Sequence, residues 1–387
     1  MCDISFAHIN SPLLGAIDET GSMFIYRVEQ SSKQTAIQWN CLLHVNRMNT
    51  IKNPYHRLVW SPHIHLSKDG EEDETVSETT YVASTSHNTI DLWKLHSIIP
   101  DGAPLVTKTD DDLSPANFEG YISFEAHTDA VTDVSLAPDG MVTCSASLDG
   151  LVKFWDTSAL VEEKKGEQMK ILHEWYPHDK APVSCIKFLD NHLLSDSEIP
   201  FWRFLLTGAD QNRQLKIWCT VKWDCLQTIS FAPGPSPGLP TNHQLAAMKL
   251  SADQSGNYIL LTDIHRRVVY CLECYSNFEE EKCMIRSANV CLIDTPVLSF
   301  HISTVKDITM MSAEEPPRRR RGVQIQSFTL HQSNLYKLQT RILHHDSFLK
   351  EVPNSGSGTP AGFLSPGRVL SPGLLSGDES IGFIKKN

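Results

Sequence analysis

The 387-residue sequence lacks any run that is long and apolar enough to cross a membrane as a helix. Its two most apolar stretches, residues 199–209 and 258–275, are interrupted by charged side chains before they reach the ~20 residues that a span requires. The first residues, Met-Cys-Asp-Ile-Ser-Phe, contain neither the basic segment nor the apolar segment of a secretory signal. We therefore expect a soluble protein with no membrane partner.

Phosphate-binding motifs and an excess of positive charge are also missing. No stretch matches GxGxxG or the Walker A pattern, so no nucleotide cofactor is expected. The 34 basic and 46 acidic side chains give a formal net charge of −12, which argues against direct nucleic-acid binding. The ten cysteines form no spaced framework and, without an export signal, indicate the reduced thiols of a cytosolic or nuclear protein.

One repeated unit is clear in the first half of the sequence. It contains Pro138-Asp139-Gly140, a turn signal that follows a partly alternating apolar segment. A second apolar segment at 141–147 leads into Asp149-Gly150, which is typical of a tight hairpin, and a third at 151–155 is followed by Asp156. Short strands at this spacing predict one sheet of a propeller.

The unit resembles a WD repeat, because its features fall in order within one window of ~40 residues. In that family a His, a Ser or Thr, an Asp and a Trp share a buried chain of hydrogen bonds. The resemblance implies that His127, Ser145, Asp149 and Trp155 form this relay here. Buried polar groups are tolerated when each satisfies the next, so we expect a structural rather than a catalytic relay, despite the Ser, His and Asp.

Weaker copies of the unit surround the clear one. The next copy opens at His178 and places Thr207, Asp210 and Trp218 near the matching positions, so the same relay is expected there. An upstream unit contains Trp93, an earlier one has no Trp, and two degenerate units follow further along the chain.

These units together predict six blades of an all-β WD-repeat propeller over residues 1–345. Residues 346–387 are rich in Ser, Pro and Gly, so we predict that they form a disordered tail. Six blades could close a ring without the usual overlap of the first and last blades. We favour a ring that lacks one N-terminal blade, because the first predicted strand already begins at residue 3.

Longer stretches resemble one family of WD-repeat proteins. Residues 174–179 read Glu-Trp-Tyr-Pro-His-Asp, residues 200–220 read Pro-Phe-Trp-Arg-Phe-Leu-Leu-Thr-Gly-Ala-Asp-Gln-Asn-Arg-Gln-Leu-Lys-Ile-Trp-Cys-Thr, and residues 223–229 read Trp-Asp-Cys-Leu-Gln-Thr-Ile. Together with Phe-Ala-His-Ile-Asn-Ser-Pro at 6–12, they resemble the WD-repeat domain of the enhancer of mRNA decapping. The likeness extends over roughly residues 3–340.

This resemblance implies a cytoplasmic scaffold of processing bodies. Such a scaffold holds the decapping enzyme and its activators together and promotes removal of the 5′ cap of mRNA. The family has a longer N-terminal portion with another blade, which implies a seven-bladed ring. It also has a Ser-rich linker and helical C-terminal regions that bind the decapping enzyme. Because neither is present here, we expect a fragment or truncated product.

Two polar motifs invite a metal or phosphate interpretation. Cys271-Leu-Glu-Cys274 is a lone CxxC whose cysteines would point to opposite faces of a strand, so no metal is expected. A dense basic cluster falls in a predicted loop, where we favour a solvated loop tip; the alternative is that it binds phosphates or an acidic partner peptide. This cluster consists of Arg318, Arg319, Arg320 and Arg321.

Trp202, Arg203 and Phe204 are a second candidate partner-binding site. If residues 201–206 form a blade strand, Trp202 and Phe204 share one face and Arg203 points to the other. Core packing explains the two aromatic rings. A rim pocket for a partner's side chain is the alternative, because interfaces favour Trp and Arg.

We interpret the chain as a non-enzymatic platform whose rim loops bind peptide segments of several proteins at once. The alternative is a WD-repeat adaptor of another assembly, such as the substrate receptor of a ubiquitin ligase. A third hypothesis is a hydrolase that uses Asp and His at the rim, but the relay already accounts for the polar residues at matched spacing.

Overall fold

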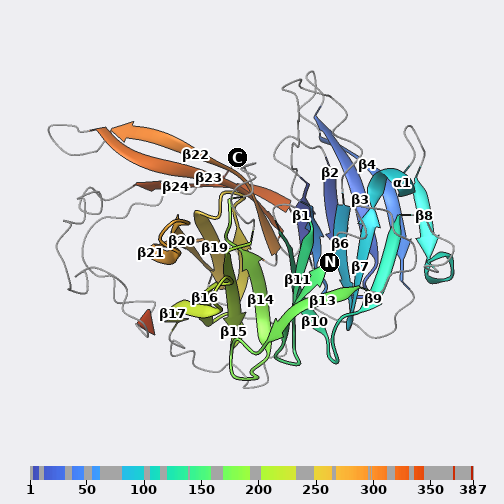
Figure 1. Cartoon of the computed structure of the whole chain (residues 1–387). Coiled ribbons are helices and arrows are strands. Elements are labelled where there is room, and N and C mark those ends of the chain that lie inside the picture. Colours follow the sequence, from blue (N-terminus) through green and yellow to red (C-terminus); the bar gives the residue numbers. More distant parts are fainter. Residues whose placement is uncertain are drawn as a thin grey trace, which may run out of the picture.

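The apolar segments of the sequence form six small β-sheets in the computed structural model of the chain (Figure 1). The sheets are arranged as the blades of a propeller, so the predicted all-β class and six-bladed architecture are confirmed. The structure describes residues 3–7, 13–30, 37–47, 55–61, 81–99, 105–113, 120–137, 140–157, 169–191, 202–231, 248–263, 267–294, 297, 299–311, 319–330, 335–343, 369–370 and 385–386.

Within each blade the strands follow chain order from the inside of the ring to the outside. The first three blades consist of β1 (Asp3–Phe6), β2 (Leu13–Ile17), β3 (Met23–Gln30) and β4 (Ile37–Asn46); β5 (Leu58–Trp60), β6 (Tyr81–Ser86), β7 (Thr89–Lys94) and β9 (Tyr121–Glu125); and β10 (Val131–Leu136), β11 (Val142–Ser147), β12 (Val152–Asp156) and β13 (Lys170–Trp175). The last three consist of β14 (Val183–Phe188), β15 (Phe204–Ala209), β16 (Gln214–Cys219) and β17 (Asp224–Phe231); β18 (Met248–Ala252), β19 (Tyr258–Asp263), β20 (Val268–Asn277) and β21 (Lys282–Leu292); and β22 (Ser299–Met311), β23 (Arg319–Leu330) and β24 (Leu335–Leu343).

The ring closes between the sixth blade and the first. The inner strands β1, β5, β10, β14, β18 and β22 each contact the next, and β22 in turn contacts β1. Across this junction the Ser299 hydroxyl donates a 2.8 Å hydrogen bond to Asp3, and the Phe6 and Phe328 rings lie 4.4 Å apart. Six blades therefore close without sharing a sheet. The sequence favoured a ring that lacks one N-terminal blade, which would leave a gap between β22 and β1. These two strands are in contact instead.

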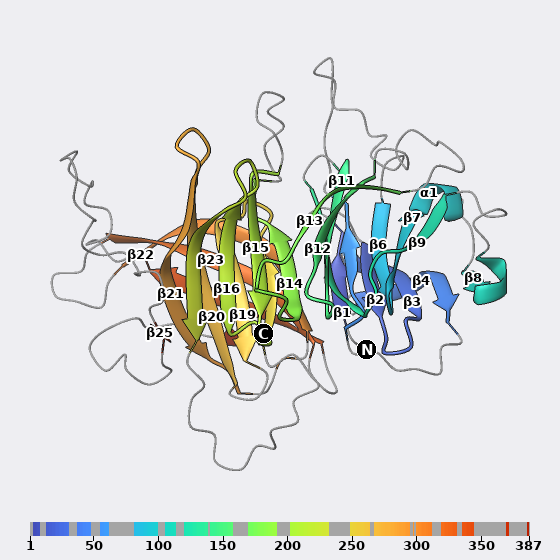
Figure 2. The same cartoon turned by 60° about the horizontal axis from the view of Figure 1, so that its bottom comes forward.

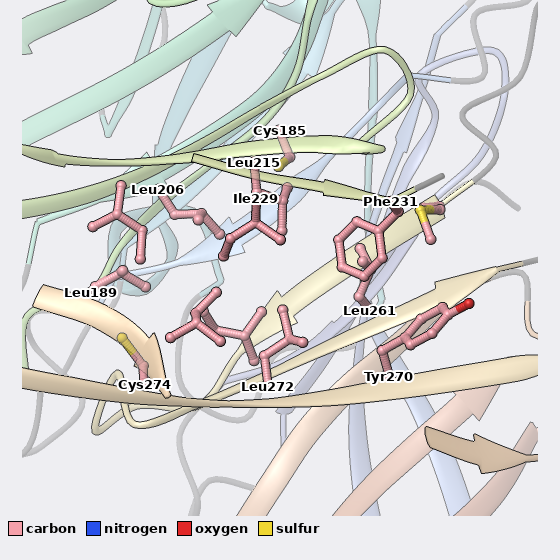
Figure 3. Packing of buried hydrophobic residues seen from close by; sticks show 14 of the residues in the cluster. Cys185, Leu189, Leu206, Leu215, Ile229, Phe231, Leu261, Tyr270, Leu272 and Cys274 are labelled. Carbon is pink, nitrogen blue, oxygen red and sulfur yellow. The ribbon is translucent and has the colours of Figure 1, made fainter. Parts of the chain in front are cut away.

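Apolar side chains pack between neighbouring blades, because each strand turns alternate residues toward the two sides of its sheet. The cluster between the fourth and fifth blades is the largest in the described part of the chain (Figure 3). It includes Leu206, Leu215, Leu261, Tyr270 and Leu272. On the face of the first blade that meets the sixth, the described buried apolar residues are Ile4, Leu14 and Ala16. Phe6, Phe24, Tyr26 and Val28 pack against these residues and are partly buried.

Three outer edges carry an additional strand. β8 (Val106–Thr109) comes from an insertion in the second blade and pairs in parallel with β4 of the first. The same insertion contains the short helix α1 (Leu95–Ile98) and a 3-10 turn (Asp110–Asp112). β25 (Val369–Leu370) pairs in parallel with β17, and β26 (Lys385–Lys386) pairs antiparallel with β24.

These two-residue strands, β25 and β26, are the described part of the C-terminal tail. The rest of residues 346–387 lies outside the described residues, and the boundary at residue 345 stays a prediction. No helix in the described ranges is both long enough and apolar enough to pass through a membrane.

The sixth blade is longer than the sequence predicts. β22 and β23 have 13 and 12 residues, and in Figure 1 they extend away from the other sheets. Arg319 to Arg321 begin β23, where they pair with β22 from Met311 to Thr309. The prediction that the basic cluster lies in a loop is therefore wrong for these three residues. The strands of this hairpin extend beyond the apolar residues from which they were predicted. Arg318 lies outside the described residues.

Candidate functional site

The relay of the third blade is assembled from two strands and two connections. His127 precedes β10, Ser145 is on β11, Trp155 is on β12, and Asp149 lies in the turn between these last two strands. Trp155 Nε1–H donates to Ser145 Oγ at 2.9 Å. Ser145 Oγ lies 2.8 Å from His127 Nε2, and His127 Nδ1 lies 3.0 Å from Asp149 Oδ2. The structure thus brings the four grouped residues together.

The hydrogen-bond partners of His127 determine which of its ring nitrogens carries the proton. Nδ1 faces a carboxylate, which only accepts, so Nδ1 carries the proton and Nε2 accepts from the Ser145 hydroxyl. Asp149 also accepts from the backbone N–H groups of Leu151 at 2.9 Å and Thr128 at 3.2 Å. Burial raises the pKa of Asp149, but the hydrogen bonds from His127 and these N–H groups outweigh it. The pKa of Asp149 therefore lies well below its ordinary value.

This relay has the connectivity of a Ser-His-Asp hydrolase triad but not its accessibility. Ser145 is 0% exposed, and its Oγ already accepts the hydrogen bond from Trp155. The side chain of His127 is also 0% exposed. A triad needs its hydroxyl to reach a substrate carbonyl. The buried position instead suits the joining of strands.

The fourth blade repeats the relay with one replacement. Trp218 Nε1–H donates to Thr207 Oγ1 at 2.9 Å, and this oxygen lies 2.9 Å from His178 Nε2. His178 Nδ1 lies 2.9 Å from Gln214 Oε1, so an amide occupies the place that we expected for Asp210. Burial lowers the pKa of His178 and so favours the neutral imidazole. The neutral ring can donate from Nδ1 to Gln214 and accept at Nε2 from Thr207.

Asp210 was therefore wrongly assigned to the relay. It is exposed in the turn after β15, with a left-handed φ of 49°. Asp149 follows Ser145 by four residues, whereas Asp210 follows Thr207 by three, so the two carboxylates occupy different positions of their turns. Gln214, at the start of β16, reaches the imidazole from the strand instead.

The second blade contains a related pair that sequence analysis missed. Trp93 Nε1–H donates to Ser84 Oγ at 2.8 Å. These residues are 9 positions apart, against 10 and 11 for the equivalent pairs in the third and fourth blades. This spacing is the signal that could have identified the pair.

A buried charged cluster, also missed, joins the first and second blades. Arg47 follows β4 and donates through Nη2 to Asp91 at 2.6 Å and through Nη1 to Asp110 at 3.0 Å. Tyr121 O–H donates to Asp91 at 2.9 Å. Burial, with the charge of Asp91, raises the pKa of Tyr121 to about 12. Since Asp110 belongs to the insertion that carries β8, this cluster fastens β8 to both blades.

A second buried carboxylate joins three successive blades. Asp133 on β10 accepts from Lys187 Nζ at 2.9 Å and from the backbone N–H of Ile186 at 3.0 Å. Arg57, at the start of the second blade, places its Nε 3.8 Å from Asp133. Charge pairing and backbone hydrogen bonds together compensate the burial of this carboxylate.

The fold separates Trp202, Arg203 and Phe204. β15 begins at Phe204, which is buried between the fourth and fifth blades. Trp202 packs against the cluster between the third and fourth blades, so the prediction that both rings share one face is wrong. The alternation does not reach Trp202, because it precedes the strand. Arg203 Nη1 donates to the carbonyl of Phe278 in the fifth blade at 2.9 Å.

The CxxC cysteines lie in separate clusters on the two faces of β20. Cys271 packs toward the sixth blade, whereas Cys274 packs toward the fourth and lies 3.5 Å, sulfur to sulfur, from Cys283. Within the described part of the chain, no three His, Cys, Asp or Glu side chains gather so that they could hold a metal ion.

Comparisons with known proteins place these features in a family. The family model described as the WD40 region of Ge1, enhancer of mRNA-decapping protein, matches residues 1–279. The chain is similar to Enhancer of mRNA-decapping protein 4 of Danio rerio, with 33% identity over 98% of this chain and 28% of the relative. The human protein of that name gives 34% identity over 82% of this chain and 22% of the relative.

A more distant relative and a solved structure are also similar. The Drosophila melanogaster homolog of Enhancer of mRNA-decapping protein 4 gives 27% identity over 70% of this chain and 19% of the relative. The WD40 domain of Toxoplasma gondii coronin aligns with a TM-score of 0.49 and 11% identity, over 89% of this chain and 70% of that one.

The curated relatives are much longer than this chain, which spans 28% of the Danio rerio protein. The family model nevertheless covers most of the residues that build the blades, including both relays. The chain therefore belongs to the family of enhancers of mRNA decapping, whose WD40 region it contains.

Proposed function

We propose that this chain is a non-enzymatic docking platform for mRNA decapping. The observation that carries the proposal is the match of the family's WD40 region to residues 1–279. The buried position of Ser145 and His127 supports a platform rather than a hydrolase, because a substrate would need access to the hydroxyl.

The platform acts by rigid presentation. Relays, buried carboxylates and apolar clusters between the blades hold the strands and the described turns in fixed positions. Partner segments that bind at different positions then have a raised effective concentration relative to one another. The partners in this proposal are the decapping enzyme and its activators, brought together to promote cap removal and mRNA decay.

The proposed location is the cytoplasm, in processing bodies. Membership in the decapping family favours this role over the ubiquitin-ligase adaptor. Trp202, Arg203, Phe204 and the basic cluster at residues 318–321 stay predictions of partner contacts. Among these, Phe204 is fully buried, so it could act only by supporting its neighbours.

Affinity purification tests this function. The tagged chain, incubated with cytoplasmic extract, should retain the decapping enzyme and decapping activators, identified by mass spectrometry. A tagged WD-repeat propeller from outside the family is the matched control and should retain neither. Recovery of ubiquitin-ligase subunits in place of decapping proteins would contradict the proposal.

A further inference from the structure

The strands of the sixth blade carry a charge opposite in sign to that of the whole chain. β22, β23 and β24 contain six cationic residues and one acidic residue, Asp307, which gives a net charge of +5. The cationic residues are Lys306, Arg319, Arg320, Arg321, Lys337 and Arg341. The connection between β22 and β23, which lies outside the described residues, adds Glu314, Glu315 and Arg318. Because the whole chain has a net charge of −12, this local excess of positive charge indicates a site for a polyanion.

Strand pairing places most of these cationic residues on one side of the sheet. Phe328 and its register partner His301 lie 4.4 and 6.1 Å, between ring centroids, from Phe6 of the first blade, so this side of the sheet faces the first blade. β23 pairs with β24 without a bulge, so every second residue counted from Phe328 lies on the same side. The cationic residues at these positions and at the positions paired with them are Lys306, Arg320, Lys337 and Arg341.

Asp307, the acidic residue of these strands, lies on the opposite side of the sheet. It pairs with Val323, which packs toward the fifth blade. Burial, with the charges of Glu273 and Asp307, raises the pKa of Tyr258 in the fifth blade, in agreement with this placement. Within the described strands of the sixth blade, the side that faces the first blade therefore has cationic residues and no carboxylate.

The described cations on this side are open to a ligand. Lys306 is exposed, and Arg341 and Gln324 are half-buried. Arg341 Nε donates to Gln324 Oε1 at 2.9 Å, and within the described residues neither Lys306 nor Arg341 forms an ion pair. Figure 2 shows the end of β22 beyond the strands of the fifth blade, as Figure 1 does. The basic side therefore continues along a hairpin that projects from the ring.

Aromatic side chains lie on the side of the first blade that faces the sixth. Trp39 on the outer strand β4 is 43% exposed and pairs with Val28 of β3. Val28 and the half-buried Tyr26 pack against the cluster that faces the sixth blade, which places Trp39 on the same side. Sites for single-stranded nucleic acid combine cations along the phosphate backbone with aromatic rings on which bases stack. An acidic peptide would use the cations alone, so the two sides together favour a nucleic acid.

We propose that the facing sides of the sixth and first blades bind single-stranded RNA. Phosphates contact Lys306, Arg341 and the cationic residues aligned with them, and a base stacks on Trp39. Because phosphate contacts carry no sequence information, the site binds RNA of any sequence. This activity goes beyond protein docking, and the choice of RNA over DNA rests on the proposed function in mRNA decapping.

Fluorescence anisotropy with the whole chain tests the site. The probe is a fluorescein-labelled oligouridine of about 16 nucleotides, which forms no duplex. We expect binding that weakens as salt is raised from about 50 to about 200 mM, because phosphate contacts release counterions. Lys306→Gln and Arg341→Gln should each weaken binding by about threefold or more at the lower salt concentration. Each should also reduce the slope of log affinity against log salt by about 0.7, the value for one phosphate contact with a single strand.

Matched variants and a competitor keep this test specific. Lys170→Gln makes the same change at an exposed residue of β13 in the third blade, across the ring from the sixth, and should bind RNA as the unchanged protein does. Trp39→Ala removes the stacking ring without changing the charge and should weaken binding. Unlabelled polyglutamate should displace the probe less well than unlabelled oligouridine. Unchanged circular dichroism and melting temperature establish that each variant is folded.

The site is overturned if the chain binds no RNA, if Lys306→Gln and Arg341→Gln bind it as tightly as the unchanged protein, or if Lys170→Gln loses as much affinity as they do. Unchanged binding by Trp39→Ala, or equal displacement by polyglutamate, would reject single-stranded RNA as the ligand. Affinity purification from ribonuclease-treated extract separates these results from failure of the proposed function. Recovery of decapping proteins by a chain that binds no RNA would reject the site alone, and RNA binding by a chain that recovers none would reject the function alone.

Discussion

The hydroxyl groups of Ser84, Ser145 and Thr207 each accept a hydrogen bond from an indole N–H on the next strand. In two of these pairs the same oxygen also meets an imidazole. All three hydroxyl-bearing residues are buried, so no water can replace a lost partner. Leaving a buried donor or acceptor without a partner costs about 1–3 kcal/mol. Each of these hydroxyl oxygens therefore stabilises its blade by connecting neighbouring strands.

Replacing Thr207 with Val tests this at one relay. The variant keeps the shape of the side chain but leaves Trp218 and His178 without their common partner, so the free energy of unfolding should fall by about 1–3 kcal/mol in urea denaturation. Thr207→Ser keeps the hydroxyl and should lose less. The control Asp210→Asn changes an exposed residue outside the relay and should stay within about 0.5 kcal/mol. A large loss in that control would contradict the assignment of Gln214.

Asp190 gives a residue-scale prediction about pH. It accepts from the backbone N–H groups of Arg203 at 2.9 Å and Phe204 at 3.3 Å, yet burial outweighs these bonds and raises its pKa to about 7. An unfolded Asp titrates near ~3.9. Between these values the folded protein binds more protons than the unfolded chain, so this group's contribution to stability is lost as pH rises through the window.

Urea denaturation at several pH values between about 4 and about 7 measures the effect. The unchanged protein should lose more stability with rising pH than Asp190→Asn, which cannot titrate at this position. The comparison concerns the slopes, so it holds even if the variant is less stable throughout. Identical slopes would show that Asp190 is already ionised at low pH.

At the scale of elements, the sequence predicts the inner strands of the blades better than the outer ones. The inner strands β10, β11 and β12 coincide with predicted segments, because both of their faces are buried and their apolar residues recur regularly. β13 was not predicted as a strand. Its residues are mostly exposed, and a bulge opposite Phe154 and Trp155 interrupts the alternation.

The contacts between blades could not be predicted for a different reason. Arg47 and Asp91 are 44 residues apart, and Asp133 and Lys187 are 54 apart, so no local pattern links either pair. The four relay residues of the third blade could be predicted to act together, because they lie close in sequence and resemble a known repeat. Gln214 was missed because an amide in the place of a carboxylate departs from that repeat.

Arg47 provides the prediction at this scale. Replacing it with Met leaves the buried carboxylate of Asp91 without its guanidinium, which should cost about 3–5 kcal/mol in the free energy of unfolding. Backbone amides of β8 should also exchange faster with deuterium, since Arg47 holds Asp110 next to that strand.

The double variant Arg47→Met with Asp91→Asn separates charge from packing. It removes the uncompensated carboxylate and should recover part of the lost stability while β8 still exchanges rapidly. If Arg47→Met alone is as stable as the unchanged protein, the charged cluster is not what fastens β8 to the first two blades.

At the scale of the whole molecule, the junction between the first and sixth blades decides whether the chain forms a platform. An open ring would leave an apolar face of a blade exposed and would no longer hold its blades in fixed positions. The junction uses Phe6 against Phe328 and the hydrogen bond from Ser299 to Asp3. The closed ring therefore depends on these contacts.

Cross-linking across this junction tests the closed ring most directly. In a chain with Asp3→Cys and Ser299→Cys, mild oxidation of the folded protein should form a disulfide between the two introduced cysteines, because the side chains they replace are hydrogen-bonded at 2.8 Å, and mass spectrometry of the digested protein should identify the linked peptides. The pair Trp39→Cys and Ser299→Cys, which places one cysteine on the outer strand of the first blade, should not be joined. A folded protein in which Cys at 3 and 299 remain free thiols under the same oxidation would contradict the six-bladed ring.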